Sequence, residues 1–122
     1  MTTMTQPKQT FKRGDVVLVL FPNSNLTTVK TRPALIVQAD NLQTDLPQII
    51  VAMITSQMFR AGHPSRVTIL FSSPEGQQSG LLTDSVVMAD NLATITLSAI
   101  YRVISSPPTA SINGALRDTL GL

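Results

Sequence analysis

Short apolar segments, separated by clusters of Gly, Pro, Asn, Asp and Ser, limit the possible folds of this chain more than any other feature. Segments of roughly four to eight residues are too short for ordinary helices and have the length of strands. Turn residues at such regular intervals are typical of small all-β barrels and sandwiches. The expected strands cover residues 16–21, 33–37, 48–55, 66–71, 81–88, 92–95 and 101–104.

The apolar patterns of these segments predict different degrees of burial. Residues 16–21 have no polar interruption, so we expect a strand that is buried on both faces. Residues 66–71 alternate, which indicates a half-buried strand. Its apolar side carries Val67, Ile69 and Phe71.

The segments between the strands are expected to be turns and loops. Residues 89–91 are polar enough to form a turn between the strands at 81–88 and 92–95, and residues 72–80 read as a polar loop. Residues 101–104 could be a strand or the end of a short helix, and their Tyr, Val and Ile favour a strand.

The C-terminal segment has a helical period instead. Ile112, Leu116 and Leu120 recur every four residues and fall on one helical face. Ser106, followed by two prolines, suits an N-cap, and Gly121 stands where a C-cap glycine belongs. The sequence therefore predicts a mainly β chain, a small β-barrel with a C-terminal α-helix packed on it.

Length and composition restrict the class of protein. With 122 residues, 43% of them hydrophobic, the chain fits one domain, expected over residues 11–122 after a flexible tail at residues 1–10. The sequence has no cysteine, which excludes disulfide scaffolds, thiolate metal sites and cysteine nucleophiles. No apolar segment has the length of a membrane span, and residues 1–10 do not resemble a signal peptide. A cytoplasmic location is expected.

Candidate metal ligands are few. His63 is the single histidine, which excludes the HExxH motif and a two-histidine ribonuclease mechanism within one chain. No ligand spacing joins Asp84 or Asp90 to His63, so neither a metal nor another cofactor is expected. His63 would also be the base of any Ser-His-Asp triad, but it lies in a Gly-Pro turn that favours an exposed side chain.

The positive charge is concentrated near the N-terminus. Residues 1–35 contain five Lys or Arg against one Asp, whereas residues 36–122 contain four Arg against six acids. Such a region can bind an anion or form a solvated surface, and the charge pattern leaves both open. Arg32 precedes one expected strand and Thr55 is the last residue of another. Functional side chains are often found at strand ends, because the rigid strands hold them in place. The same residues can equally be a surface cation and a turn-forming hydroxyl.

A series of motifs runs in order from about residue 11 to the C-terminus. They are RGDVV at 13–17, FP at 21–22, KTRPALIV at 30–37, VAMITSQ at 51–57, GLLTDSVV at 80–87, DNLATI at 90–95, and the closing AL and LGL. Each motif alone is common. In this order and at these spacings they resemble the successive blocks of the MazF/PemK toxins.

The resemblance implies a fold, an activity and partners. The fold is an SH3-like small β-barrel of the CcdB/MazF type with a C-terminal α-helix, and the protein is a homodimer. The activity is that of an mRNA interferase, a sequence-specific endoribonuclease that cleaves single-stranded RNA without metal and leaves a 2′,3′-cyclic phosphate. The partner is a cognate antitoxin whose disordered tail blocks the RNA groove. The catalytic Arg and Thr of the family fall on Arg32 and Thr55.

Those two roles agree with the chemistry of the side chains. Attack of a ribose 2′-OH on the adjacent phosphate builds negative charge on the equatorial oxygens. The Arg32 guanidinium can donate two parallel hydrogen bonds to such oxygens, and the Thr55 hydroxyl can add a neutral donor. The family also assigns acid–base work to the arginine, although a guanidinium is a poor base in water.

Further residues are candidates for RNA binding. Ser56 and Gln57 follow Thr55 directly, and Asp90 and Asn91 stand where relatives have an acid and an amide that read bases. Lys30 lies two residues before the arginine and could contact a phosphate or be a solvated loop cation.

The segment before Arg32 departs from the family pattern. Many members carry a Gly-Ser-Glu-Gln stretch there, whereas residues 23–30 contain no acid. This keeps a second function open, a non-catalytic barrel that binds an antitoxin or a topoisomerase, as a CcdB-like poison or a degraded toxin. The presence of Arg32 and Thr55 favours the nuclease.

Overall fold

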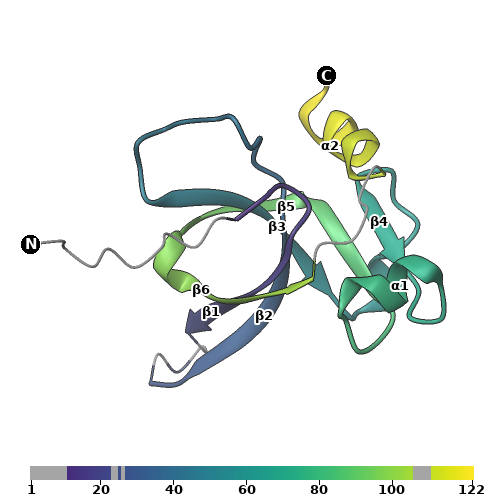
Figure 1. Ribbon diagram of the computed structural model, residues 1–122. Helices are drawn as coiled ribbons and strands as arrows, with labels where there is room; N and C mark the ends of the chain where they lie inside the picture. The colour runs from purple at the N-terminus through teal and green to yellow at the C-terminus, as the bar shows by residue number, and fades with distance from the viewer. Residues whose placement is uncertain (1–10, 23–24, 26, 106–110) are drawn as a thin grey trace, which may run out of the picture.

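The computed structural model describes residues 11–22, 25, 27–105 and 111–122, and strands are its main regular secondary structure (Figure 1). The six strands are β1 (Val16–Pro22), β2 (Val29–Ile36), β3 (Gln48–Thr55), β4 (Arg66–Ile69), β5 (Ser85–Thr96) and β6 (Ile100–Ser105). The helices are α1 (Pro74–Ser79) and α2 (Ile112–Leu120), with 3₁₀ turns η1 (Met58–Arg60) and η2 (Leu97–Ala99). The mainly β architecture with a C-terminal helix is confirmed, and residues 1–10 lie outside the described part.

The strands form one antiparallel sheet in the order β4-β5-β3-β2-β1-β6, which curls round on itself (Figure 1). β1 is shared, because it pairs with β2 along its full length and with β6 on its other side. At the far end, the short helix α1 contacts β6, where the Ser105 hydroxyl donates a hydrogen bond to the Ser79 carbonyl. This contact helps to hold the curled sheet in a barrel-like shape.

Alternating side chains divide the core into two clusters, as the period of a strand requires. Val17 and Val19 belong to the cluster inside the curl, whereas Val16 belongs to the cluster on the outer face. All three are buried, but further along the outer face Leu18 is half-buried and Leu20 is 38% exposed, so the expected burial on both faces holds only at the start of the strand. The outer cluster is covered by α2, through Ile112 and Ala115.

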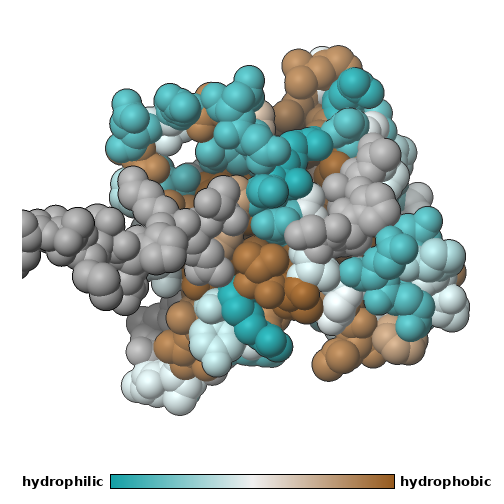
Figure 2. Space-filling view, in the orientation of Figure 1, coloured by the Kyte–Doolittle hydropathy of each residue, from teal (hydrophilic) through white to brown (hydrophobic). Residues whose placement is uncertain are grey.

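The packing of α2 differs in part from the expected face. Ile112 and Ala115 are buried and Leu116 packs against the outer cluster, but Leu120 is 55% exposed. Residues eight apart on a helix are rotated by about 80° from each other, so a four-residue repeat drifts off the buried face. Hydrophobic side chains accordingly remain visible on the surface near the end of α2 (Figure 2).

The two ends of α2 can be compared with their predicted caps. Gly121 has a φ of 71° and its N–H donates to the Arg117 carbonyl, so the predicted C-cap is confirmed. Ser111 is the N-cap, and the helix begins at Ile112. The predicted N-cap, Ser106, lies outside the described residues.

Residues 89–91 do not form the expected turn, because β5 is one continuous strand through them. Its register against β3 shifts at this point, where Met88 lies opposite Met53 and Leu92 lies opposite Ala52. The three intervening residues therefore form a bulge, which bends the strand without ending it.

Two further predictions were wrong at the β4 end of the sheet. β4 ends at Ile69, and Phe71 is 44% exposed instead of lying on the apolar side of a strand. Residues 72–80 contain the helix α1 instead of a loop, since the Ser73 hydroxyl accepts the Gly76 N–H and Gly80 closes the helix with a φ of 74°.

Candidate active-site groove

A groove opens where β2 and β3 separate. The two strands are paired from Ile36 opposite Val51 to Ala34 opposite Met53, and the ladder stops there. Beyond that point β2 continues along β1, while β3 continues along β5. Arg32 and Thr55 each lie two residues past the last pair, at equivalent positions on the two diverging strands.

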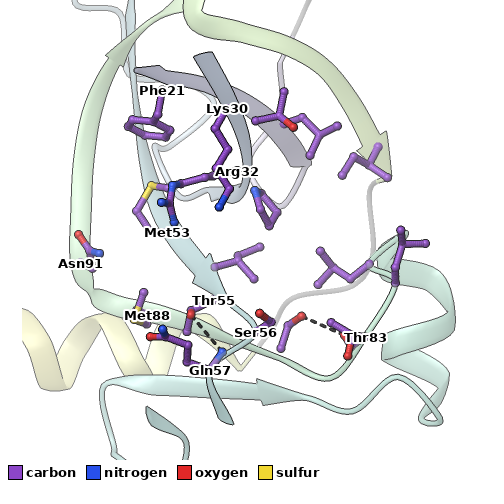
Figure 3. Close-up of a pocket in the computed structure, with 18 of the residues that line it drawn as sticks. Phe21, Lys30, Arg32, Met53, Thr55, Ser56, Gln57, Thr83, Met88 and Asn91 are labelled. Carbon is purple, nitrogen blue, oxygen red and sulfur yellow. Dashed lines mark hydrogen bonds between the residues drawn. The ribbon is translucent and has the colours of Figure 1, made fainter. Parts of the chain in front are cut away.

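The groove between them has a volume of about 920 Å³ and is lined by β1, β2, β3, η1, β5 with the segment leading into it, and β6. The lining includes six of the seven predicted site residues: Lys30, Arg32, Thr55, Ser56, Gln57 and Asn91. Lys30 and Arg32 lie on one side of the groove, and Thr55, Ser56 and Gln57 lie across from them (Figure 3). The structure thus brings together residues that are far apart in the sequence.

Four cations line the groove, and no acid is among its described lining residues. Lys30 and Arg32 are strand residues on the same face of β2, whereas Lys30 was expected in a loop and Arg32 just before the strand. The difference arises because β2 starts four residues earlier than its apolar run. The pairing with β1 explains this early start, since Phe21 lies opposite Lys30. Arg60 and Arg102 are the other two cations.

The structure gives the side chains of Lys30 and Arg32 no hydrogen bond or ion pair to any described residue, and both residues are exposed. Their charges therefore remain available to a ligand. A cluster of like charges without a neutralising acid raises the local concentration of anions.

Thr55 is held in a turn at the end of β3. The Gln57 backbone N–H donates to Thr55 Oγ1 at 3.1 Å, as the dashed line in Figure 3 shows. With that bond the oxygen acts as acceptor, so its own hydrogen is left to donate elsewhere. Thr55 is half-buried, whereas Ser56 and Gln57 are exposed.

Arg60 and Arg102 were not predicted as site residues. Arg60 lies in η1, where its Nε donates to Gln57 Oε1 at 3.1 Å and its Nη1 approaches Met88 Sδ at 3.8 Å. The three-residue spacing of Gln57 and Arg60 is the one local signal, because residues three apart meet across a turn. Arg102 reaches the groove only through the pairing of β6 with β1, which no local pattern reveals.

Asp90 is the one predicted site residue that does not line the groove. Its carboxylate accepts two hydrogen bonds from Arg66, at 3.2 Å from Nε and 2.8 Å from Nη2. These hydrogen bonds lower the pKa of Asp90 and raise that of Arg66. Asn91, the next residue, lines the groove.

The residues considered as metal ligands all have protein partners. Asp84 Oδ1 accepts the Phe71 N–H at 2.7 Å, and the buried Ser65 hydroxyl lies 2.6 Å from His63 Nδ1. Among the described residues no three His, Cys, Asp or Glu side chains gather in a way that could hold a metal ion. His63 does not line the groove, so the structure brings no Ser-His-Asp triad to it.

A curled barrel with a cationic groove at its strand ends places the chain in the class of small β-barrel proteins suited to an anionic ligand. The model of the PemK-like, MazF-like toxins of type II toxin–antitoxin systems matches residues 12–117. Endoribonuclease MazF of Staphylococcus saprophyticus is 30% identical over 115 residues, which cover 91% of this chain and 92% of that protein. The chain belongs to the PemK/MazF toxin family.

Solved structures show the same fold. The Mycobacterium tuberculosis toxin MazF-mt6 is 26% identical, with a TM-score of 0.62 over 88% of this chain and 92% of that chain. An endoribonuclease in complex with its cognate antitoxin, from a mycobacterial species, is 24% identical, with a TM-score of 0.67 over 91% of this chain and 95% of that chain. These similarities confirm the expected MazF-like barrel.

No helix in the described part of the chain has the length and apolarity that a membrane crossing requires.

Proposed function

We propose that this chain is the endoribonuclease toxin of a type II toxin–antitoxin system and cleaves single-stranded RNA at short sequences without a metal ion. The observation that carries the proposal is the groove, where Arg32 and Thr55 face each other and no described lining residue is acidic. The name of the Staphylococcus relative and the family support the same activity.

The proposed reaction is an internal transfer at phosphorus. The ribose 2′-oxygen forms a bond to the adjacent phosphorus, and the bond from phosphorus to the 5′-oxygen breaks. The 2′-OH loses a proton and the 5′-oxygen gains one, so the products are a 2′,3′-cyclic phosphate and a 5′-OH.

Arg32 is proposed to stabilise the charge that develops in this step. Its guanidinium has no partner among the described residues, so both edges of the fork remain open to the equatorial phosphate oxygens. Donors that are in place before the reaction lose no energy to reorganisation, which is the advantage of fixing them on strands.

Thr55 is proposed to supply a second, neutral donor. The Gln57 N–H fixes the Thr55 oxygen at 3.1 Å and leaves the hydroxyl hydrogen to point at the phosphate. A neutral donor of this kind acts chiefly on the transition state, where the oxygen charge is largest.

The rest of the groove is proposed to hold the RNA strand. Lys30 and Arg102 are placed to contact phosphates, while Ser56, Gln57 and Asn91 present polar groups suited to base edges. Contacts to phosphates position a strand, and contacts to bases select its sequence.

The remaining assignments follow from the family. We propose that residues 11–122 act as one toxin domain in the cytoplasm, as a homodimer whose paired chains extend the cationic surface along a flexible strand. A cognate antitoxin with acidic and apolar side chains would fit a groove that combines cations with apolar walls.

The test is incubation of the purified protein with a long single-stranded RNA in EDTA, beside Arg32→Ala. Discrete fragments from the wild type alone are expected. Intact RNA with both proteins would favour the non-catalytic barrel, and cleavage only after addition of a divalent cation would contradict the metal-free reaction.

A further inference from the structure

Arg66, on β4, joins three elements beside the groove through one guanidinium. Its Nε and Nη2 donate to the two Asp90 oxygens, at 3.2 and 2.8 Å, on the bulge of β5. Its Nη1 donates to the Arg60 carbonyl at 3.0 Å, in η1. A guanidinium used in this way has a fixed geometry that a lysine cannot reproduce.

The first element that Arg66 holds, η1, has little stability of its own. It is three residues long, and its N-cap, Gln57, makes no side-chain capping bond. Short 3₁₀ turns have poor hydrogen-bond geometry and depend on their surroundings. The Arg60 Nε donates to Gln57 Oε1 at 3.1 Å, so the Gln57 side chain is bonded to the turn that Arg66 holds.

The second element, the bulge of β5, has the same need for an anchor. Three residues there have no partner on β3, and the Ala89 N–H donates instead to the Ser65 carbonyl at 2.9 Å. Asp90 in this bulge is held by Arg66, and its neighbour Asn91 lines the groove. The anchor at Asp90 therefore restricts how far the backbone beside Asn91 can move.

We propose that Arg66 is a positioning residue that sets Gln57 and Asn91 for reading RNA bases, and that Asp90 serves as its anchor and contacts no base. This inference rests on the proposed function, because it names what selects the sequence in the same groove. One cation outside the groove thereby controls amide side chains from two separate elements.

The test is a double-mutant cycle on a panel of short RNAs. Arg66→Ala should lower the preference for the best sequence over its single-base variants by about tenfold. Asp90→Ala should lower it less, because Arg66 can still donate to the Arg60 carbonyl. The double variant should lose no more than Arg66→Ala, because Asp90 acts only through Arg66. An additional loss from Asp90→Ala in the Arg66→Ala background would show that Asp90 itself reads a base and would overturn the proposal.

A readout without RNA separates the clamp from the nuclease. The amides of Arg60 and Ala61 donate within η1, to the Gln57 and Met58 carbonyls, at 3.1 and 3.0 Å. Their hydrogen exchange should become faster in Arg66→Ala and stay unchanged in Arg117→Ala, which removes the same charge from an exposed position on α2. Unchanged exchange at η1 in Arg66→Ala would overturn the proposal.

An inactive wild-type protein would count against the proposed function alone. The exchange comparison and the binding of the same RNA panel, measured by fluorescence anisotropy, would still decide whether Arg66 sets the base preference. Loss of that binding preference in Arg66→Ala supports the clamp, and an unchanged preference contradicts it.

Discussion

Arg32 and Arg66 are both strand arginines near one groove, but the fold treats them in opposite ways. Arg66 donates two hydrogen bonds to Asp90 and one to the Arg60 carbonyl. Arg32 has no such partner among the described residues. The difference teaches that an arginine whose anion is supplied by the fold serves structure, whereas one without an internal anion is left for a ligand.

The same distinction separates the two sides of the bulge in β5. Asp90 is held by Arg66 on the outer side, and the resulting hydrogen bonds lower its pKa. Asn91 lines the groove, where the structure gives its side chain no hydrogen bond to a described residue. Two neighbours in the sequence therefore have different surroundings, one bonded to Arg66 and the other lining the groove.

The largest effect is expected when Arg32 is replaced. Arg32→Ala should lower the RNA cleavage rate by at least about a hundredfold, as expected for the loss of a preorganised donor to the reacting charge. Arg32→Lys should also lose most of the activity, because a point charge cannot replace the fork. Single-turnover cleavage of a short RNA measures the rates of both variants, with Arg117→Ala as the control. A near-normal rate in Arg32→Ala would show that Arg32 is not a catalytic residue.

A smaller effect is expected at Thr55. Thr55→Ala should lower the cleavage rate on the order of tenfold to a hundredfold while RNA affinity changes little, since the donor acts on the transition state. Thr55→Ser keeps the hydroxyl and should keep much of the activity. Rates and dissociation constants on one RNA separate the two quantities, and an equal loss in both would make Thr55 a binding residue.

Lys30 is expected to change the salt dependence more than the specificity. Each phosphate contact on a single strand contributes about −0.7 to the slope of log affinity against log salt concentration. Lys30→Ala should make that slope shallower by about one contact, with the cleavage sequence unchanged. A shifted cleavage sequence would mean that Lys30 reads a base.

The smallest effect is expected at Asp90, the acid that is paired with Arg66. The Arg66 hydrogen bond lowers the pKa of Asp90 in the folded protein. The pair therefore stabilises the folded state at pH values above the ordinary pKa of an unfolded Asp. This contribution is lost as the pH falls through the lowered pKa. Both groups are exposed to solvent, which keeps the effect small. The free energies of unfolding of wild type and Asp90→Asn, measured with denaturant, should therefore differ slightly at neutral pH and become equal in acid. A difference that grows in acid would contradict the lowered pKa of Asp90.

The sequence predicted much of the fold because burial leaves a periodic pattern. The strand at 16–21 and the C-cap at Gly121 depend on local features, and both are present, although the strand is buried on both faces only at its start. The early start of β2 depends on pairing with β1 and leaves no apolar signal, so Lys30 was expected in a loop. The bulge in β5 depends on its register against β3, so residues 89–91 read as a turn.

Only those site residues that lie in the family motifs could be predicted. Six of the predicted residues line one groove, as the family motifs imply. Arg60 and Arg102 were missed because a 3₁₀ turn and a strand pairing bring them there. The task of Asp90 could not be predicted because its partner, Arg66, meets it only across the β4–β5 pair.

The most direct test of the central claim, that the open arginine serves attack by a ribose 2′-OH, is cleavage of two matched RNAs in EDTA. The two differ only by a single 2′-deoxy nucleotide at the mapped cleavage site. We expect the all-ribose RNA to give a 2′,3′-cyclic phosphate and a 5′-OH, and the substituted RNA to bind equally well and stay intact. Cleavage of the 2′-deoxy RNA at the same bond and a similar rate would contradict the account.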